Sequence, residues 1–96
     1  MNYLMLSVGR RGELLKNFRK SISEGSRIIA TDLSPYAPAL YFADKQYLVP
    51  RIDDPAYIDV ILDICKKESI NAVTTFIDPE IEILALNRDK FVALGV

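Results

Sequence analysis

Three places in the sequence carry residue types that could bind a ligand, and each directly follows an apolar run. The first is the turn Gly9–Gly12, where two arginines and the amides of a following helix would favour an anion. The second is Asp32, which stands where a dinucleotide-binding domain carries its ribose-binding acid. The third is Asp78 with Glu80, which follows the fourth apolar run.

Neither well-defined phosphate-binding loop fits the first of these places. A dinucleotide fingerprint, G-x-G-x-x-G counted from Gly9, requires glycines where this chain has Arg11 and Leu14. A Walker A loop also fails, because no Lys-Ser/Thr pair follows Gly12. What remains is a weaker candidate, in which Gly9, Arg10 and Arg11 contact an anion or another small substrate.

Each candidate also has a structural alternative, which the sequence leaves open. Asp32 could cap the turn formed by the Ser-Pro-Tyr that follows it closely. Asp78, Pro79 and Glu80 match the N-cap, N1 and N2 positions of a helix. Five basic residues near the first turn could form a solvated surface instead of a phosphate site: Arg10, Arg11, Lys16, Arg19 and Lys20.

Short apolar runs that alternate with helical patterns must position these candidates. The apolar runs predict strands at Tyr3–Val8, Arg27–Asp32, Gln46–Pro50 and Asn71–Phe76. Amphipathic spacing and helix caps predict helices at Glu13–Ser23, after the Asp-Pro of residues 54–55, and over 78–94. Between the second and third strands, two prolines predict a loop or a short helical turn. This segment is expected to pack four side chains: Tyr36, Leu40, Tyr41 and Phe42.

Strands that alternate with helices in this order pair in parallel through right-handed crossovers. We therefore expect an α/β, three-layer Rossmann-like domain whose sheet has the order 3-2-1-4, with helices on both faces. In such a sheet the three candidate places share the carboxyl edge. The closing Gly95-Val96 looks like the first step into a fifth strand, without which the fourth strand would be an exposed edge. We expect a truncated fifth strand, and residues 1–96 to be one domain of a longer protein.

The composition restricts the function further. The 96 residues are 50% hydrophobic and carry a net charge of −1, which suits one globular domain with no general attraction to nucleic acid or to an anionic membrane. With no histidine and Cys65 alone, neither the usual zinc sites nor an intramolecular disulfide can form. Cys65 falls on the apolar face of its expected helix, so we interpret it as a core residue. The first apolar run is too short for a signal peptide or a membrane span, and we expect a cytoplasmic protein.

The order and spacing of these pieces resemble the N-terminal, pre-ATP-grasp domain of ATP-grasp ligases, especially those similar to the carbamoyl-phosphate synthase large chain. The resemblance runs from Met1 to Val96. It rests on several pieces taken together: Gly9–Arg11, Asp32 with Ala37-Pro38, Ala43-Asp44, Pro50, and Asp78-Pro79-Glu80.

The resemblance implies a ligase that uses ATP to activate a carboxylate as an acyl phosphate, which an amine or ammonia then captures. In that family ATP and Mg²⁺ lie between two later subdomains, so both cofactors are expected outside this segment. The catalytic lysines, the arginine and the metal-binding acids have no counterpart here, and no activity is expected of the 96 residues alone. The pre-ATP-grasp domain packs on those subdomains and lines one side of the substrate cleft. The residues that would face the cleft are Gly9, Arg10, Arg11, Asp32, Asp78 and Glu80.

The partners implied are the missing ATP-grasp subdomains and small carboxylate and amine substrates, with neither a nucleic acid nor a membrane. Two other functions remain open. A stand-alone Rossmann-like module could bind a nucleotide or a small anion without catalysis. A structural domain could instead form a homodimer through the open edge of the fourth strand.

Overall fold

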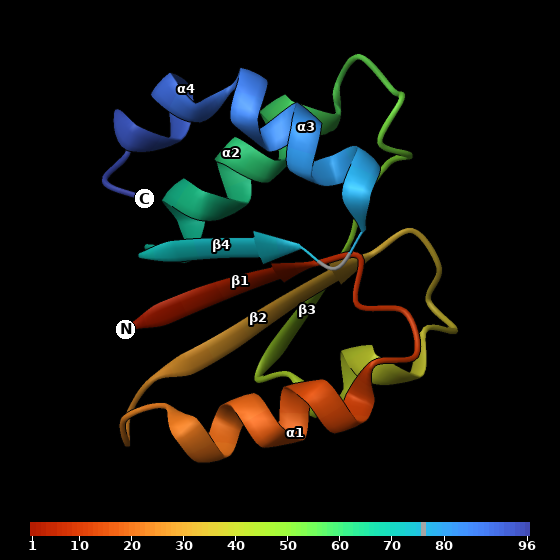
Figure 1. Cartoon of the computed structure of the whole chain (residues 1–96), viewed down its shortest axis with the longest axis vertical. Helices are drawn as coiled ribbons and strands as arrows, with labels where there is room; N and C mark the ends of the chain where they lie inside the picture. Colours follow the sequence, from red (N-terminus) through yellow and green to blue (C-terminus); the bar gives the residue numbers. More distant parts are fainter. Residues whose placement is uncertain (76) are drawn as a thin grey trace.

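Four parallel strands form the sheet in the computed structural model, which describes residues 1–75 and 77–96 (Figure 1). The strands are β1 (Asn2–Leu6), β2 (Arg27–Asp32), β3 (Lys45–Leu48) and β4 (Ala72–Thr75), in the order β3-β2-β1-β4. The helices are α1 (Gly12–Ser21), α2 (Tyr57–Lys67), α3 (Asp78–Leu86), α4 (Arg88–Val92) and a short 3-10 helix, η1 (Pro38–Phe42). The α/β Rossmann-like fold and the predicted strand order are confirmed.

Helices cover both faces of the sheet, with α1 and η1 on one face and α2, α3 and α4 on the other (Figure 1). Alternate residues of β1 enter two separate cores, because successive side chains of a strand point to opposite faces. Leu4 and Leu6 pack in one core with Ile61 of α2. Met5 packs in the other core with Leu15 of α1. Both faces of the sheet are therefore buried, as is usual for parallel sheets.

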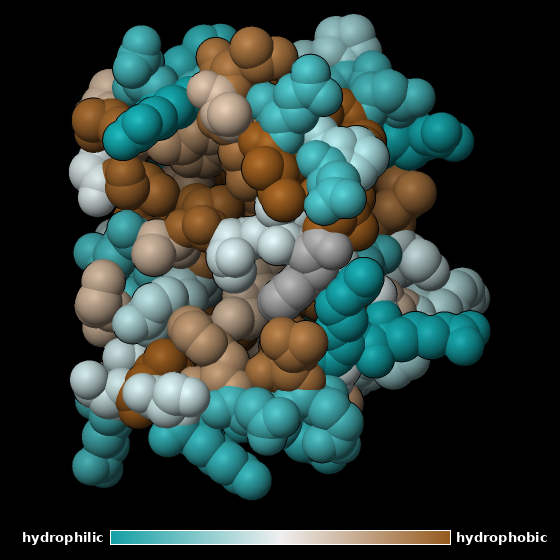
Figure 2. All heavy atoms as spheres, viewed as in Figure 1, coloured by the Kyte–Doolittle hydropathy of each residue, from teal (hydrophilic) through white to brown (hydrophobic). Residues whose placement is uncertain are grey.

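The outer edge of β4 pairs with no strand among the residues that the structure describes. Beside this edge, an apolar hollow of about 300 Å³ is lined by Tyr3, Phe18 and Val73 among others. A second hollow of about 330 Å³ includes Phe91 and Val96 in its lining. Figure 2 shows hydrophobic residues gathered around this edge of the sheet. The expected fifth strand would cover this edge, and it stays a prediction.

Helix α1 spans Gly12–Ser21 instead of Glu13–Ser23, and two further helix boundaries differ from the sequence prediction for a visible reason. The last helical segment is divided at Asn87 into α3 and α4. The Asn87 side chain donates from Nδ2 to the Ile83 carbonyl (2.9 Å), which takes the acceptor that a continuous helix would offer to the Asn87 amide. Before α2, the Asp54 carboxylate accepts the Ala56 amide (2.8 Å). This segment therefore forms a turn, and the helix begins only at Tyr57.

The proline-containing segment forms η1 but packs fewer side chains than expected. Ala39 and Leu40 are buried. Tyr36 and Tyr41 are 87% and 71% exposed, so the prediction that they pack is wrong. A short 3-10 helix presents only one narrow side to the sheet layer, because side chains three residues apart eclipse each other.

Cys65 lies in the core on the α2 side of the sheet, as its position on the apolar helix face predicted. The side chain is 3% exposed, and burial raises the pKa of the thiol to about 11. A buried thiol with a raised pKa is unreactive at neutral pH. Cys65 is therefore a core residue.

Candidate functional site

A cavity of about 520 Å³ lies at the carboxyl edge of the sheet. Its lining comes from the segments that follow β1, β2 and β3, from the start of α2, and from the residue before α3. Its polar side chains are Ser7, Arg11, Asp32, Arg51 and Tyr57. Open α/β sheets bind ligands at this edge, and the volume is in the range of small-molecule sites. We refer to this space as the carboxyl-edge cavity.

The side chain of Asp32 holds the turn after β1 against the end of β2. The Gly9 amide donates to Asp32 Oδ2 (2.8 Å), and the Ser34 amide donates to Asp32 Oδ1 (3.1 Å). Gly9 adopts a φ of +52°, and a Cβ placed on it would lie 3.6 Å from Arg11 Nη1, so the arginine folds back over the turn. Asp32 therefore positions the turn, and it also lines the carboxyl-edge cavity.

Glu80 is fully buried directly behind this cavity, which differs from the exposed helix-cap position considered for it. Its carboxylate accepts hydrogen bonds from three hydroxyl groups, those of Ser7 (3.1 Å), Tyr57 and Thr75. These residues come from the ends of β1 and β4 and the start of α2. Asp78 is the first residue of α3 rather than its N-cap, and Glu80 comes two residues later. One carboxylate thus ties three segments of the carboxyl edge together.

Ser7 and Tyr57 connect the buried Glu80 to the cavity, because both residues also line it. Ser7 has a φ of +52°, a conformation that is uncommon for residues other than glycine and that often marks functional sites. Burial and the adjacent Glu80 carboxylate raise the pKa of Tyr57 far above its usual value. The Tyr57 hydroxyl therefore stays protonated and donates a hydrogen bond to Glu80.

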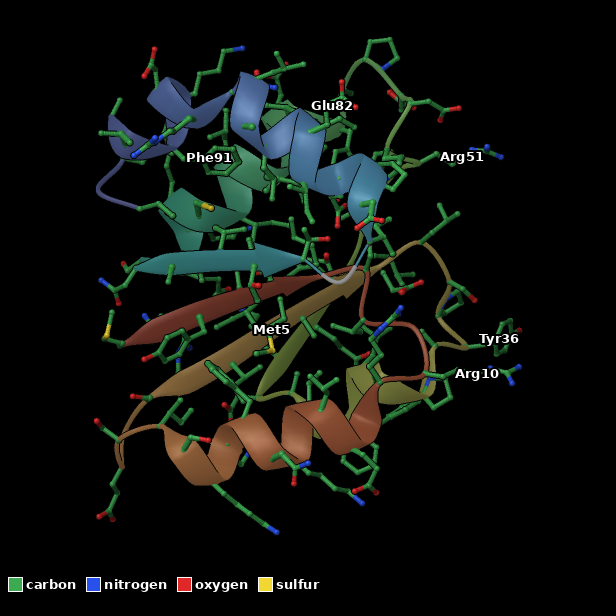
Figure 3. The ribbon with its side chains drawn as sticks, viewed as in Figure 1. Met5, Arg10, Tyr36, Arg51, Glu82 and Phe91 are labelled. Carbon is green, nitrogen blue, oxygen red and sulfur yellow. The ribbon has the colours of Figure 1, made fainter. Side chains whose placement is uncertain are left out.

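The structure brings four of the six predicted site residues to the carboxyl-edge cavity. Three of them line it directly: Gly9, Arg11 and Asp32. Glu80 lies behind it, bonded to two lining residues. Arg10 and Asp78 are exposed and do not belong to the lining. Figure 3 shows Arg10 pointing away from the body of the molecule.

Sequence reasoning missed three polar residues of the lining. Arg51 follows Pro50 at the end of the third predicted strand, and that position at the carboxyl edge could have identified it. Ser7 was treated as part of a strand, and Tyr57 as a residue of the apolar helix face. No sequence pattern indicated that both hydroxyls would meet the same buried carboxylate.

Two positions at which other α/β domains contact a nucleotide make structural contacts in this domain. At the start of α1, a Cβ on Gly12 would lie 2.6 Å from the Phe42 ring, so this glycine serves close packing against η1 rather than approach of a phosphate. Each oxygen of Asp32 accepts one backbone amide, at the position where a dinucleotide-binding domain has its ribose-binding acid. Within residues 1–75 and 77–96, no three potential metal-ligating side chains gather.

The comparison with known families agrees with this geometry. A family model described as the PylC-like, N-terminal domain matches residues 3–96. The chain belongs to the PylC-like N-terminal domain family. As a PylC-like domain it is a pre-ATP-grasp domain of ATP-grasp ligases, which confirms the broader resemblance. A search of the curated proteins found no match.

Among the residues that the structure describes, no helix has both the length and the apolar character needed to cross a bilayer.

Proposed function

We propose that the chain is the N-terminal substrate-cleft domain of an ATP-dependent ligase that joins a carboxylate to an amine or ammonia. The reaction would resemble that of the carbamoyl-phosphate synthase large chain and proceed through an acyl phosphate. The observation that supports this most directly is the carboxyl-edge cavity in a domain of the PylC-like N-terminal family.

In this proposal the chain binds and positions the substrate, and residues outside it supply ATP and Mg²⁺ binding. The turn at Gly9–Arg11 and the side chain of Asp32 form one wall of the cleft, and the bond from Gly9 to Asp32 keeps that wall fixed. A wall of this kind raises the rate by orienting the substrate and by excluding water. The 96 residues alone are therefore expected to be inactive.

The proposal is tested with the protein expressed from its entire natural reading frame. ADP and phosphate release is measured with panels of small carboxylates and amines, and hydroxylamine is added to trap an acyl phosphate as a hydroxamate. ADP formation that requires both a carboxylate and an amine or ammonia is expected. Calorimetry on residues 1–96 provides the control, since binding of ATP with micromolar affinity by this segment would contradict an ATP site elsewhere.

A dimerising role is the second candidate, because an apolar hollow lies on each side of the unpaired edge of β4. In that case two copies would associate through this edge. Sedimentation equilibrium of the 96 residues at millimolar concentration decides the matter. A strict monomer would exclude this role, whereas a dimer that dissociates when Val73 is replaced by lysine would support it.

A further inference from the structure

Behind the floor of the carboxyl-edge cavity lies a buried carboxylate that has no ion partner among the described residues. Glu80 is fully buried, and none of the ion pairs among the described residues includes it. Its two carboxylate oxygens accept hydrogen bonds from three hydroxyl groups. A buried charge without a cation is costly, and such charges are concentrated at functional sites.

The direction of these hydrogen bonds determines what the floor can bind. A serine or tyrosine hydroxyl has one proton, and in both Ser7 and Tyr57 that proton is directed to Glu80. Both residues line the cavity, and a hydroxyl oxygen that donates its proton can still accept a hydrogen bond from a ligand. The floor thus consists of two hydrogen-bond acceptors backed by a negative charge, and it favours a cationic donor over an anion.

The positions of the charged lining residues also favour a cation at the floor of the cavity. Asp32 adds a second carboxylate to the lining. Arg51 points away from the molecule (Figure 3), and its Nε lies 3.3 Å from Asp53 Oδ1, so its charge is at the solvent-exposed rim. Arg11 is exposed and folds over Gly9. The charge of Arg51 therefore lies at the rim and that of Arg11 over the turn after β1, whereas the Glu80 carboxylate lies behind the floor.

We propose that Ser7 and Tyr57, with Glu80 behind them, form a subsite for a protonated amine, either an ammonium ion or a primary alkylammonium group. The two hydroxyl oxygens accept its N–H groups, and the Glu80 carboxylate stabilises its charge. Ser7 is held in its uncommon backbone conformation with its hydroxyl bonded to Glu80, which preorganises the subsite. The identification of this ligand as the amine substrate rests on the proposed function, but binding of the amine to the domain does not require ligase activity.

The subsite is tested by NMR titration of residues 1–96 with methylammonium chloride, following the amide signals of Ser7 and Tyr57. Sodium chloride at equal ionic strength measures the general salt effect, and sodium acetate tests an anion. Saturable shifts with methylammonium alone are expected. Equal shifts with sodium chloride, or tighter binding of acetate, would overturn the proposal.

Three variants and one matched control assign the binding to the floor. Glu80→Gln keeps the shape of the side chain and removes its charge, and it is expected to weaken methylammonium binding by about tenfold or more. Ser7→Ala and Tyr57→Phe each remove one acceptor from the lining and are expected to weaken it by about threefold or more. Thr75→Val is the control, because Thr75 bonds to the same carboxylate but does not line the cavity. Its affinity should stay within about twofold of the unmodified chain.

The dispersion of the amide spectrum shows whether each variant is folded. If Glu80→Gln unfolds, the subsite is tested by comparing the methylammonium affinities of Tyr57→Phe and Thr75→Val. Equal affinities in these two variants would overturn the proposal. In the protein from the entire reading frame, Tyr57→Phe should raise KM for the amine more than it lowers kcat. Ligase activity with an unchanged KM would refute the subsite alone, whereas methylammonium binding without any ligase activity would refute only the proposed function.

Discussion

Two buried glutamates lie at opposite edges of the sheet, and their carboxylates interact with different kinds of partner. Glu68, at the amino edge, lies 2.8 Å from Arg27 and 2.8 Å from Lys45, and it also accepts the Tyr47 hydroxyl. Among the residues that the structure describes, Glu80, at the carboxyl edge, accepts hydrogen bonds only from hydroxyl groups. Arg27 and Lys45 therefore neutralise Glu68, whereas Glu80 has no cation among the described residues and lies behind a cavity.

The difference separates a structural charge from a candidate functional one. Hydrogen bonds from Lys45 and Tyr47 lower the pKa of Glu68 to about 2, so its ionised form contributes to the stability of the fold. Glu80 holds three segments together as well, but it does so without a cation. A buried carboxylate that has hydrogen bonds yet lacks an ion partner can still interact electrostatically with a ligand.

The largest loss of stability is expected for Glu80→Ala, about 3 kcal/mol. The change leaves the hydroxyls of Ser7, Tyr57 and Thr75 without their acceptor and opens a void behind the cavity. Urea unfolding measures the loss. Asp78→Ala, an exposed position in the same helix, is the control and should change stability by less than about 0.5 kcal/mol. Equal effects of the two changes would show that Glu80 does not organise the carboxyl edge.

A smaller loss is expected for Glu68→Gln, about 1 to 2 kcal/mol. The side chains of Arg27 and Lys45 are 42% and 51% exposed, so both cations are solvated again when their partner loses its charge. The same urea experiment measures it, with the exposed Lys67→Gln as the control. A loss larger than that of Glu80→Ala would reverse the proposed ranking of the two edges.

The pH dependence of stability provides a separate test of the amino edge. The pKa of Glu68 is lowered from 4.5 in the unfolded chain to about 2 in the folded one, so its contribution is present above pH 4.5 and is lost as the pH falls toward 2. Urea midpoints between pH 2.5 and 6 should therefore fall with decreasing pH, and less steeply in Glu68→Gln. Part of the slope should remain in that variant, because the pKa of Asp44 is also lowered in the folded chain. Burial alone would raise the pKa of Asp44, but the Ile28 amide and Arg19 outweigh it and lower the pKa.

The sheet could be predicted from the sequence because each strand and helix has a recognisable pattern within its own short segment. Apolar runs such as Arg27–Asp32 recur between amphipathic helices, and parallel order with right-handed crossovers follows from that alternation. The location of Asp32 at the carboxyl edge followed from the same pattern. The division of the last helix did not, because it depends on one side-chain bond from Asn87 to the Ile83 carbonyl.

The floor of the cavity could not be predicted, because its contacts join distant parts of the chain. Ser7 and Tyr57 are separated from Glu80 by 73 and 23 positions. The Asp-Pro-Glu that opens α3 has the local pattern of a helix start, and this pattern gave no sign that the Glu80 carboxylate is buried. Tertiary contacts, rather than propensity, decided the orientation of that side chain.

The smallest effect is expected for Gly12→Ala, and it separates packing from ligand binding at the carboxyl edge. A Cβ at this position would lie 2.6 Å from the Phe42 ring, which is 37% exposed and can turn aside, so the expected loss is about 1 kcal/mol. In a Phe42→Ala background the same change should cost nothing, and a double-mutant cycle measures this coupling. Methylammonium binding should stay within about twofold. Weakened binding at unchanged stability would instead make Gly12 part of the ligand site, and the cavity would then extend from its floor to the start of α1.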